Sequence, residues 1–216
     1  MQSTEHISHE IEIKINLESF ANYLKLIGYL GQIVQEDRHI NGFFDTEDRA
    51  LAAHGWALRV RADGKRGFIT AKSISIQTGA AAIRQEIEAQ IRLEDALEIL
   101  NLYKDIRSIH AMPVDFLRDA LGDKPVKKLI QFENTRQLKN YRIHDVDYLF
   151  EIDTTLFSDG NVDYELEVEL PDVSKVQIVE KELELLFDQL RIPFVKQTES
   201  KFARALHRAG IYPVSR

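Results

Sequence analysis

The chain of 216 residues contains no cysteine, which excludes disulfide scaffolds, thiolate zinc sites, iron–sulfur clusters and cysteine nucleophiles. Any metal must therefore be bound through oxygen or imidazole ligands. No apolar run approaches the roughly 20 residues that a membrane-spanning helix needs, and the polar N-terminus lacks a secretory apolar segment. We therefore expect a soluble, cytoplasmic protein without a membrane partner.

Positive charge is also scarce, since 28 lysines and arginines stand against 35 aspartates and glutamates and give a formal net charge of −7. Nucleic-acid-binding proteins derive much of their affinity from surplus positive charge, so this balance argues against a nucleic-acid partner. Hydrophobic residues make up 44% of the chain, an ordinary globular share, and no repeat, low-complexity tract or linker divides it. We expect one domain over residues 1–216.

Several segments alternate charged and apolar residues with a period of two, which is typical of strands with two different faces. In residues 10–15 one face carries Glu10, Glu12 and Lys14, and the other carries three isoleucines. Similar patterns predict strands over residues 57–61, 86–92 and 164–170. Weaker ones cover residues 66–75, 127–136, 141–144 and 148–154, which makes about eight strands. Residues 64–67 predict a hairpin turn.

Amphipathic helical spacing appears over residues 20–27, 93–103, 116–121, 179–190 and 202–209, with Ser174 as the expected N-cap before the fourth of these segments. Such helices need an apolar surface to pack on, and the apolar strand faces provide it. The class is therefore α+β with a mostly antiparallel sheet.

The charged strand faces have two interpretations. A single alternating strand is ordinarily the solvated face of an open antiparallel sheet. Here, however, like charges recur two residues apart on several strands, a costly arrangement unless counter-charges lie nearby. A sheet closed into a barrel gathers these groups in one lumen and removes exposed sheet edges. We predict an eight-stranded antiparallel β-barrel, a tunnel with a charged lumen and helices packed on the outside.

Grouped carboxylates without thiolates suit a hard divalent cation such as Mg²⁺ or Mn²⁺. Arginines and lysines that face the same space suit a polyanion, above all phosphate. The two sets together indicate a metal-bound polyphosphate, and the chemistry that they support is phosphoryl transfer.

Nine sequence blocks occur in an order that resembles the CYTH superfamily, also called the triphosphate tunnel metalloenzymes. They are E-x-E-x-K at residues 10–14, FFDT at 43–46, LRVR at 58–61, TAK at 70–72, EIE at 86–88, FENTR at 132–136, EID at 151–153, YELE at 164–167 and SKF at 200–202. The resemblance covers about residues 8–212. It implies a tunnel that binds triphosphate-containing substrates together with divalent metal.

The resemblance also implies roles for individual residues. Glu10 and Glu12 are similar to a catalytic pair that orients or activates the attacking water, and Lys201 to a catalytic lysine that reaches in from the C-terminal helix. The implied triphosphate-binding residues are Lys14, Arg59, Arg61, Lys72, Arg136 and Lys201. The implied metal ligands and acids that shape the site are Glu165, Glu167, Glu12, Glu86, Glu88 and Asp153. Asn134 replaces the first cation of a K-x-R pair that many members carry.

Among the activities of the superfamily, this chain looks most like an inorganic triphosphatase that converts tripolyphosphate and water to pyrophosphate and phosphate. The enzymatic alternatives are a class IV adenylate cyclase and a thiamine triphosphatase. A non-enzymatic alternative is a module that binds polyphosphate or nucleotide without cleaving it. The expected partner is a small-molecule triphosphate, and the expected state is a monomer or a homodimer.

Several further residues have open interpretations. Trp56 is expected to pack in the core or at the rim, with base stacking as the alternative. The histidines show no ligand spacing and are interpreted as surface or structural residues. By strand parity, Glu151 and Arg142 are candidates for the lumen, and Glu169 for the tunnel mouth.

Overall fold

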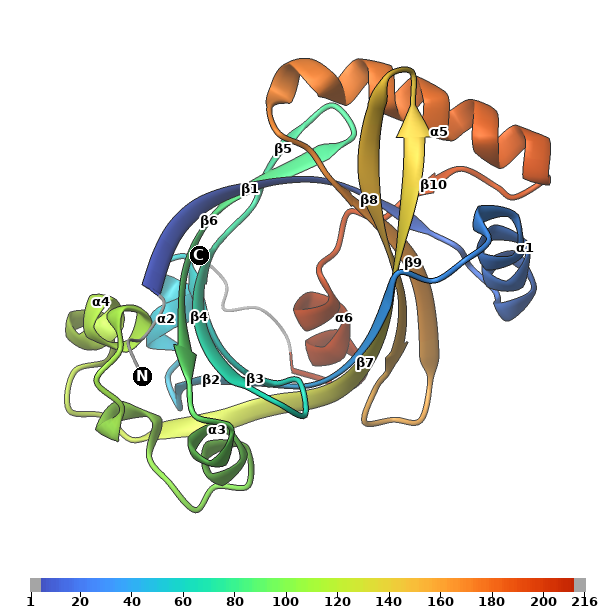
Figure 1. Ribbon diagram of the computed structural model, residues 1–216. Coiled ribbons are helices and arrows are strands. Elements are labelled where there is room, and N and C mark those ends of the chain that lie inside the picture. The colour runs from blue at the N-terminus through green and yellow to red at the C-terminus, as the bar shows by residue number, and fades with distance from the viewer. Residues whose placement is uncertain (1–4, 212–216) are drawn as a thin grey trace.

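Eight long strands close into an antiparallel ring in the computed structural model, which describes residues 5–211 (Figure 1). The order around the ring is β1, β9, β8, β7, β2, β3, β4 and β6, and the pairing of β1 with β6 closes it. The predicted α+β barrel is thus confirmed. Its strands are β1 Glu5–Asn16, β2 Gln35–Thr46, β3 Trp56–Ala62, β4 Gly67–Ser73, β6 Ala81–Ile91, β7 Val126–Ile143, β8 Val146–Leu156 and β9 Val162–Glu169. Two short strands pair with members of the ring: β5 Ile76–Thr78 pairs with β6, and β10 Val195–Lys196 pairs with β1.

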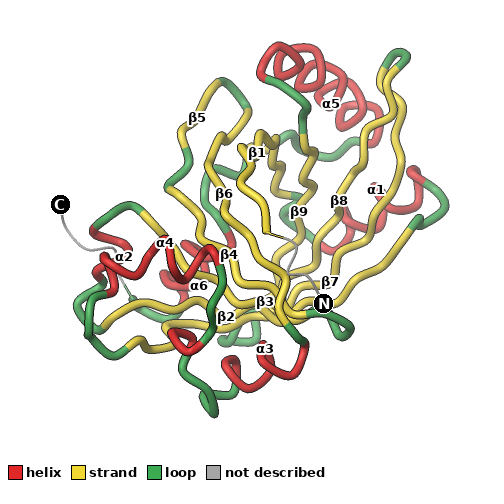
Figure 2. Tube along the Cα trace, turned by 60° about the vertical axis from the view of Figure 1, so that its left-hand side comes forward, coloured by secondary structure: helices red, strands yellow, loops and turns green. Residues whose placement is uncertain are grey.

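All the described helices except α6 pack against the outer face of this ring, where the apolar side of each alternating strand lies (Figures 1 and 2). The helices are α1 Phe20–Leu30, α2 Ala50–Ala53, α3 Leu93–Leu100, α4 Met112–Leu121, α5 Val176–Leu190 and α6 Lys201–Arg208. One core joins α1 and α5 to β1, β8 and β9, and a second joins α3 and α4 to β3, β4 and β6. Burial of the apolar faces outward leaves the charged faces to the lumen.

The last helix, α6, lies within the outline of the ring in Figure 1. Phe202 near its start stacks on Phe43 of β2 with 4.1 Å between ring centroids, and Ala205 and Leu206 join the same apolar cluster. Ser200 caps the helix by accepting a hydrogen bond from the backbone N–H of Ala203 at 3.1 Å. These contacts hold the first residue of α6, Lys201, against the lumen.

A tight turn joins β3 to β4, as predicted for residues 64–67. Asp63 and Arg66 pair across it, and Gly64 has a φ of 80°. Gly67 begins β4 at the point where α3 approaches the sheet. A Cβ atom at this position would lie 2.5 Å from the Cβ of Ala96, so α3 packs here only because residue 67 is glycine.

One strand was missed and two local predictions were wrong. Residues 35–46 form β2, which the alternation patterns did not predict. The segments 127–136 and 141–144 belong to one long strand, β7. Ser174 does not cap a helix: Asp172 caps a 3₁₀ turn over Val173–Lys175 by accepting from the Ser174 N–H at 2.8 Å, and α5 begins at Val176. The reason is that the aspartate carboxylate satisfies the first free N–H before the serine is reached.

Within residues 5–211, every helix is too short or too polar to cross a lipid bilayer.

Candidate active site

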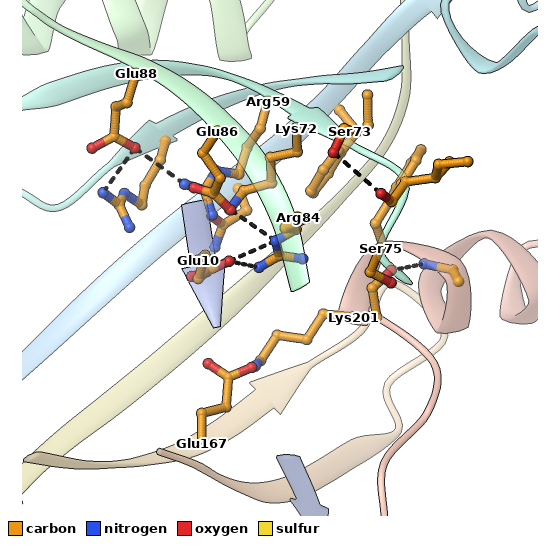
Figure 3. A pocket seen from close by; sticks show the side chains of 18 of the residues that line it. Glu10, Arg59, Lys72, Ser73, Ser75, Arg84, Glu86, Glu88, Glu167 and Lys201 are labelled. Carbon is orange, nitrogen blue, oxygen red and sulfur yellow. Dashed lines mark hydrogen bonds and ion pairs between the residues drawn. The ribbon is translucent and has the colours of Figure 1, made fainter. Parts of the chain in front are cut away.

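The charged strand faces meet in a cavity of about 640 Å³ inside the ring (Figure 3). All the cations predicted to bind triphosphate line it: Lys14, Arg59, Arg61, Lys72, Arg136 and Lys201. Four of the predicted acids line it as well, namely Glu10, Glu86, Glu88 and Glu167. The remaining three, Glu12, Asp153 and Glu165, are at most 4% exposed and contact these same cations. The structure therefore brings the whole predicted set together.

Two arginines on β3 line this cavity. Arg59 and Arg61 each place one terminal nitrogen near Glu88 Oε2, at 3.3 and 3.5 Å, and the Thr70 hydroxyl donates to the same oxygen at 2.7 Å. The Nε atoms of both arginines are buried and find no acceptor within residues 5–211. Burial and the neighbouring Arg59 lower the pKa of Arg61 to about 10. Buried donors without acceptors favour an anionic ligand.

Opposite this wall, three buried carboxylates converge. Oxygens of Asp153 on β8 and of Glu165 and Glu167 on β9 lie within 4.8 Å of one another. The Lys201 ammonium lies among them, 2.8 Å from Asp153 Oδ2 and 2.9 Å from Glu167 Oε1, and it also contacts Glu165. Because these ligands are hard oxygen donors that already stabilise a positive charge, the cluster could hold a hard divalent cation.

Neighbouring cations favour the ionised form of Asp153. Arg136 donates from Nε to Asp153 Oδ1 at 2.8 Å and from a terminal nitrogen to Oδ2 at 2.6 Å. Burial alone would raise the pKa of Asp153, but Arg136 and Lys201 outweigh it and hold the pKa well below its usual range. Burial lowers the pKa of Lys201 to about 7 even beside these acids.

The catalytic pair predicted on β1 lies between the two walls. Lys14 Nζ joins Glu12 Oε1 at 3.0 Å to Glu167 Oε1 at 2.8 Å, and so connects the pair to the carboxylate cluster. Burial raises the pKa of Glu12. Burial would raise that of Glu10 too, but Lys72 and Arg84 outweigh it and hold the Glu10 pKa well below its usual range. The pKa values of these two neighbouring carboxylates are thus shifted in opposite directions, an arrangement common to acid and base pairs.

Residues 8–205 match the family model for the CYTH domain. The chain belongs to the CYTH-domain family. CYTH enzymes act on triphosphates, and the family is in general metal-dependent.

Solved structures show the same fold as this CYTH domain. A Hippeastrum protein, described as a candidate adenylyl cyclase with a dominant triphosphatase activity, is 24% identical with a TM-score of 0.80, covering 93% of this chain and 96% of its own. A candidate adenylate cyclase from Bacillus halodurans is 20% identical with a TM-score of 0.69, covering 92% and 97%. A Pyrococcus horikoshii protein is 17% identical with a TM-score of 0.59, covering 92% and 99%. No curated protein sequence matches the chain.

Glu86 and Glu88 occupy the cationic wall of the CYTH tunnel and not the acidic one. Glu86 contacts Lys72 and Arg84, and Glu88 contacts Arg59 and Arg61. Burial, together with Arg59 and Arg84, lowers the pKa of Lys72 to about 8. The convergent cluster of metal-type ligands found among the described residues contains neither glutamate, so their predicted metal-binding role stays a prediction.

Some lumen residues of this CYTH domain had no predicted role. Arg84 on β6 contacts Glu10, Glu12 and Glu86, and its even-numbered parity with Glu86 and Glu88 was a usable signal. Arg204 lies three residues after Lys201 in α6, on the same side of the helix, and donates a hydrogen bond to Glu165 at 2.6 Å. His39 lines the cavity from β2, where burial and Arg61 lower its pKa to about 4. No sequence signal indicated His39, because its strand was not predicted.

Of the residues whose interpretation was left open, Glu151 and Glu169 lie where strand parity predicted, and Arg142 does not. Glu151 contacts Arg136 in the lumen, and burial raises its pKa to about 7. Glu169 is exposed and lines the cavity, as expected for the mouth. The placement of Arg142 in the lumen was wrong, because its side chain is 62% exposed and lies 3.8 Å from Asp147 near the hairpin end of β7. Trp56 packs edge-on against Phe116 at 4.8 Å between centroids and also lines the cavity.

Asn134, which the family resemblance marks as the replacement of a cation, lies in the lumen. It is 4% exposed, lines the cavity, and accepts a hydrogen bond from the Thr155 hydroxyl at 2.8 Å. The neutral amide of Asn134 is thus hydrogen-bonded to Thr155.

Proposed function

We propose that this CYTH domain hydrolyses tripolyphosphate to pyrophosphate and phosphate with the help of Mg²⁺ or Mn²⁺. The observation that carries the proposal is the pair of arginines that line the lumen, Arg59 and Arg61, whose buried Nε donors find no acceptor among residues 5–211, in a lumen that also holds a buried carboxylate cluster. The triphosphatase activity described for the Hippeastrum protein supports the same reaction. A small-molecule triphosphate is the partner that such a lumen would take.

Charge balance supports the requirement for metal. The lumen carboxylates already pair with the lumen cations, as Glu88 does with Arg59 and Glu167 with Lys14. A bound triphosphate adds several negative charges that these side chains do not neutralise. A divalent ion held by Asp153, Glu165 and Glu167 would supply the missing positive charge and polarise the phosphate.

In the proposed reaction, the lumen cations bind the phosphate oxygens and orient the chain of the substrate. The Glu10 and Glu12 pair accepts a proton from the attacking water, whose oxygen forms a new bond to the terminal phosphorus. The bond from this phosphorus to the bridging oxygen breaks, and the oxygen leaves with its electron pair as part of pyrophosphate. Lys201 and Arg136 stabilise the charge that develops there.

The test is phosphate release from tripolyphosphate, ATP and thiamine triphosphate with Mg²⁺ or Mn²⁺. We expect tripolyphosphate to be the fastest substrate. A Glu165→Gln, Glu167→Gln double variant should lose turnover, whereas a Glu133→Gln, Glu184→Gln double variant removes two exposed carboxylates and should retain it. Equal rates in the two double variants would contradict the proposal.

A second candidate activity is the conversion of ATP to cyclic AMP. The cavity extends from the charged lumen to Trp56 and Ile74, which leaves apolar surface beside the phosphate-binding cations. Chromatography of the products formed from ATP distinguishes the two activities, since cyclic AMP and pyrophosphate would appear in place of phosphate.

The non-enzymatic alternative is a domain that binds tripolyphosphate without cleaving it. In that case Glu10→Gln would change neither binding nor phosphate release. A Glu10→Gln variant that retains binding and loses turnover indicates hydrolysis.

A further inference from the structure

His39 on β2 lines the lumen without a hydrogen-bond partner. It shares the lumen face of β2 with Asn41 and Phe43, which line the same cavity. Neither ring nitrogen of His39 makes a hydrogen bond or an ion pair with another residue in the described range, 5–211. Of these three side chains, the imidazole alone can gain a positive charge. Both of its nitrogens are open to a ligand in the lumen.

The charges around His39 come from three other strands. Arg61 on β3 stands opposite Asn41 in the register of β2 and β3, two residues along from His39. Burial, together with Arg61, Arg136 and Arg59, lowers the pKa of His39 to about 4, and Asp153 on β8 acts in the opposite direction. The imidazole of the free domain is therefore neutral near pH 7.

The remaining neighbours of His39 along β2 and β7 add no positive charge of their own to the cavity. Asn134, directly opposite His39 in the register of β2 and β7, is neutral. Asp37 lies on the same face of β2, accepts a hydrogen bond from Gln35 at 2.6 Å and stands opposite Arg136. The lumen wall formed by β2 thus carries a positive charge only when His39 is protonated.

A triphosphate in the lumen would reverse the electrostatic effect of its surroundings on His39. Phosphate oxygens paired with Arg59 and Arg61 would offset the charges that now disfavour a proton on the ring. The imidazolium form would also donate a charge-assisted hydrogen bond to phosphate, which is stronger than the hydrogen bond of a neutral ring. Binding of the anion and protonation of His39 should therefore favour each other.

We propose that His39 is a triphosphate-binding residue that is neutral in the free domain, takes up one proton from solvent when the anion binds, and then donates to a phosphate oxygen as an imidazolium. The inference rests on the proposed function for the class of ligand, but it does not require hydrolysis. By linkage, His39 should raise the affinity for tripolyphosphate as the pH falls, because the protonated form binds the anion more tightly.

Other groups titrate in the same range, so the contribution of His39 is the difference between the wild type and a variant. Burial brings the pKa values of Lys72, Lys201 and Glu151 to about 8, 7 and 7. Tripolyphosphate also exchanges protons near neutral pH. His39→Gln removes the titrating ring and leaves all of these groups in place.

The first test is calorimetric titration with tripolyphosphate at pH 8 and pH 6, in EDTA so that no metal supports hydrolysis. The affinity of the wild type should rise about 3- to 10-fold more than that of His39→Gln between these two pH values. Titrations at pH 6.5 in buffers of different ionisation enthalpy count the protons taken up. The wild type should take up roughly half a proton to one proton more than His39→Gln. His110→Gln, which removes an exposed histidine, is the matched control and should behave as the wild type.

A second variant keeps the inference testable if His39→Gln does not fold. His39→Lys places a permanent cation at the same point of the lumen, so its affinity at pH 8 should approach that of the wild type at pH 6. NMR titration of the histidine ring protons, with the His39 signal assigned by its loss in either variant, gives a direct readout. Saturating tripolyphosphate should raise the midpoint of the His39 titration by about 2 pH units or more.

Three outcomes would overturn the inference. They are an equal pH dependence of affinity in the wild type and His39→Gln, an equal loss of affinity at both pH values in His39→Gln, and an unchanged His39 titration on addition of tripolyphosphate. A wild type that shows proton uptake through His39 but hydrolyses no triphosphate contradicts the proposed function alone. A wild type that hydrolyses tripolyphosphate without this uptake contradicts the role of His39 alone.

Discussion

Glu88 would compete with a bound triphosphate for Arg59 and Arg61. Its carboxylate lies beside both Arg59 and Arg61, so a phosphate must replace it or share the guanidinium groups. We predict that Glu88→Gln lowers KM for tripolyphosphate by about 3- to 10-fold, because the amide is a weaker competitor than the carboxylate. Initial-rate kinetics at fixed Mg²⁺ measures this. An unchanged KM with a raised Mg²⁺ requirement would instead make Glu88 a metal ligand.

His39 makes the stability of the domain depend on pH. Burial and Arg61 lower its pKa from 6.5 to about 4, so the folded protein resists its protonation. Between these two values the unfolded chain binds more protons, and stability falls as the pH drops below 6.5. His39→Gln should reduce this loss of folding free energy at pH 5 by about 1 kcal/mol. The value is no larger because the side chain is partly exposed and solvent screens its charge. Urea melts at pH 7.5 and 5 measure it, with His110→Gln, an exposed site, as the control. An identical pH dependence in His39→Gln and the wild type would contradict the prediction.

At the residue scale, sequence indicated the lumen wherever charge alternated regularly. Glu10, Glu12 and Lys14 share a face because successive side chains of a strand point to opposite sides. Arg84 was overlooked since the predicted strand began at residue 86, two positions after it. The contacts that pair each acid with a cation, such as the link from Lys14 to Glu167, join distant parts of the chain and are set by register, which one sequence does not reveal.

At the scale of elements, α6 links helix stability to activity, because Lys201 is its first residue. Ser200→Ala removes the N-cap and should destabilise the helix by about 1 kcal/mol. Lys201 would then lose its fixed position, and kcat should fall severalfold. Ser19→Ala is the matched control, since Ser19 caps α1 by accepting from the Asn22 N–H at 3.2 Å outside the lumen. Chemical denaturation and kinetics on both variants test this, and equal kcat values for the two would refute it.

The elements that sequence analysis missed have identifiable causes. The first half of β2, residues 35–39, is polar throughout and contains no β-branched residue, so local preference gave no strand signal. Pairing with β7 over residues 35–46 and with β3 over residues 40–44 supplies the missing stabilisation. In β7, residues 137–140 interrupt the alternation, yet pairing with β8 continues through them. Tertiary pairing thus overrides weak local preference in both strands.

At the scale of the whole molecule, closure turns a repeated local pattern into a site. β1 pairs with both β6 and β9, so Glu10 and Glu12 face the cationic wall on one side and the carboxylate cluster on the other. An open sheet with the same strands would leave these groups apart and hydrated. The ring therefore brings the arginines of β3 and the carboxylates of β8 and β9 into one lumen.

Charge balance across the lumen predicts cooperative stabilisation by substrate and metal. Tripolyphosphate alone adds unbalanced negative charge beside the acidic cluster, and Mg²⁺ alone competes with Lys201 for the same carboxylates. Together they neutralise each other, so each should bind more tightly in the presence of the other. At about 100 times the dissociation constant, a ligand stabilises the fold by about 2.7 kcal/mol. For a domain of this size that corresponds to a rise in Tm of about 5–10 °C. Thermal melts with tripolyphosphate, with the metal ion and with both measure these shifts in Tm. To avoid hydrolysis, the Glu165→Gln, Glu167→Gln variant is used with Mg²⁺ and the wild type is used with Ca²⁺. Only in the wild type should the shift in Tm with both ligands exceed the sum of the two single shifts. Additive shifts in both proteins would mean that the carboxylates of β9 do not hold the metal beside the substrate.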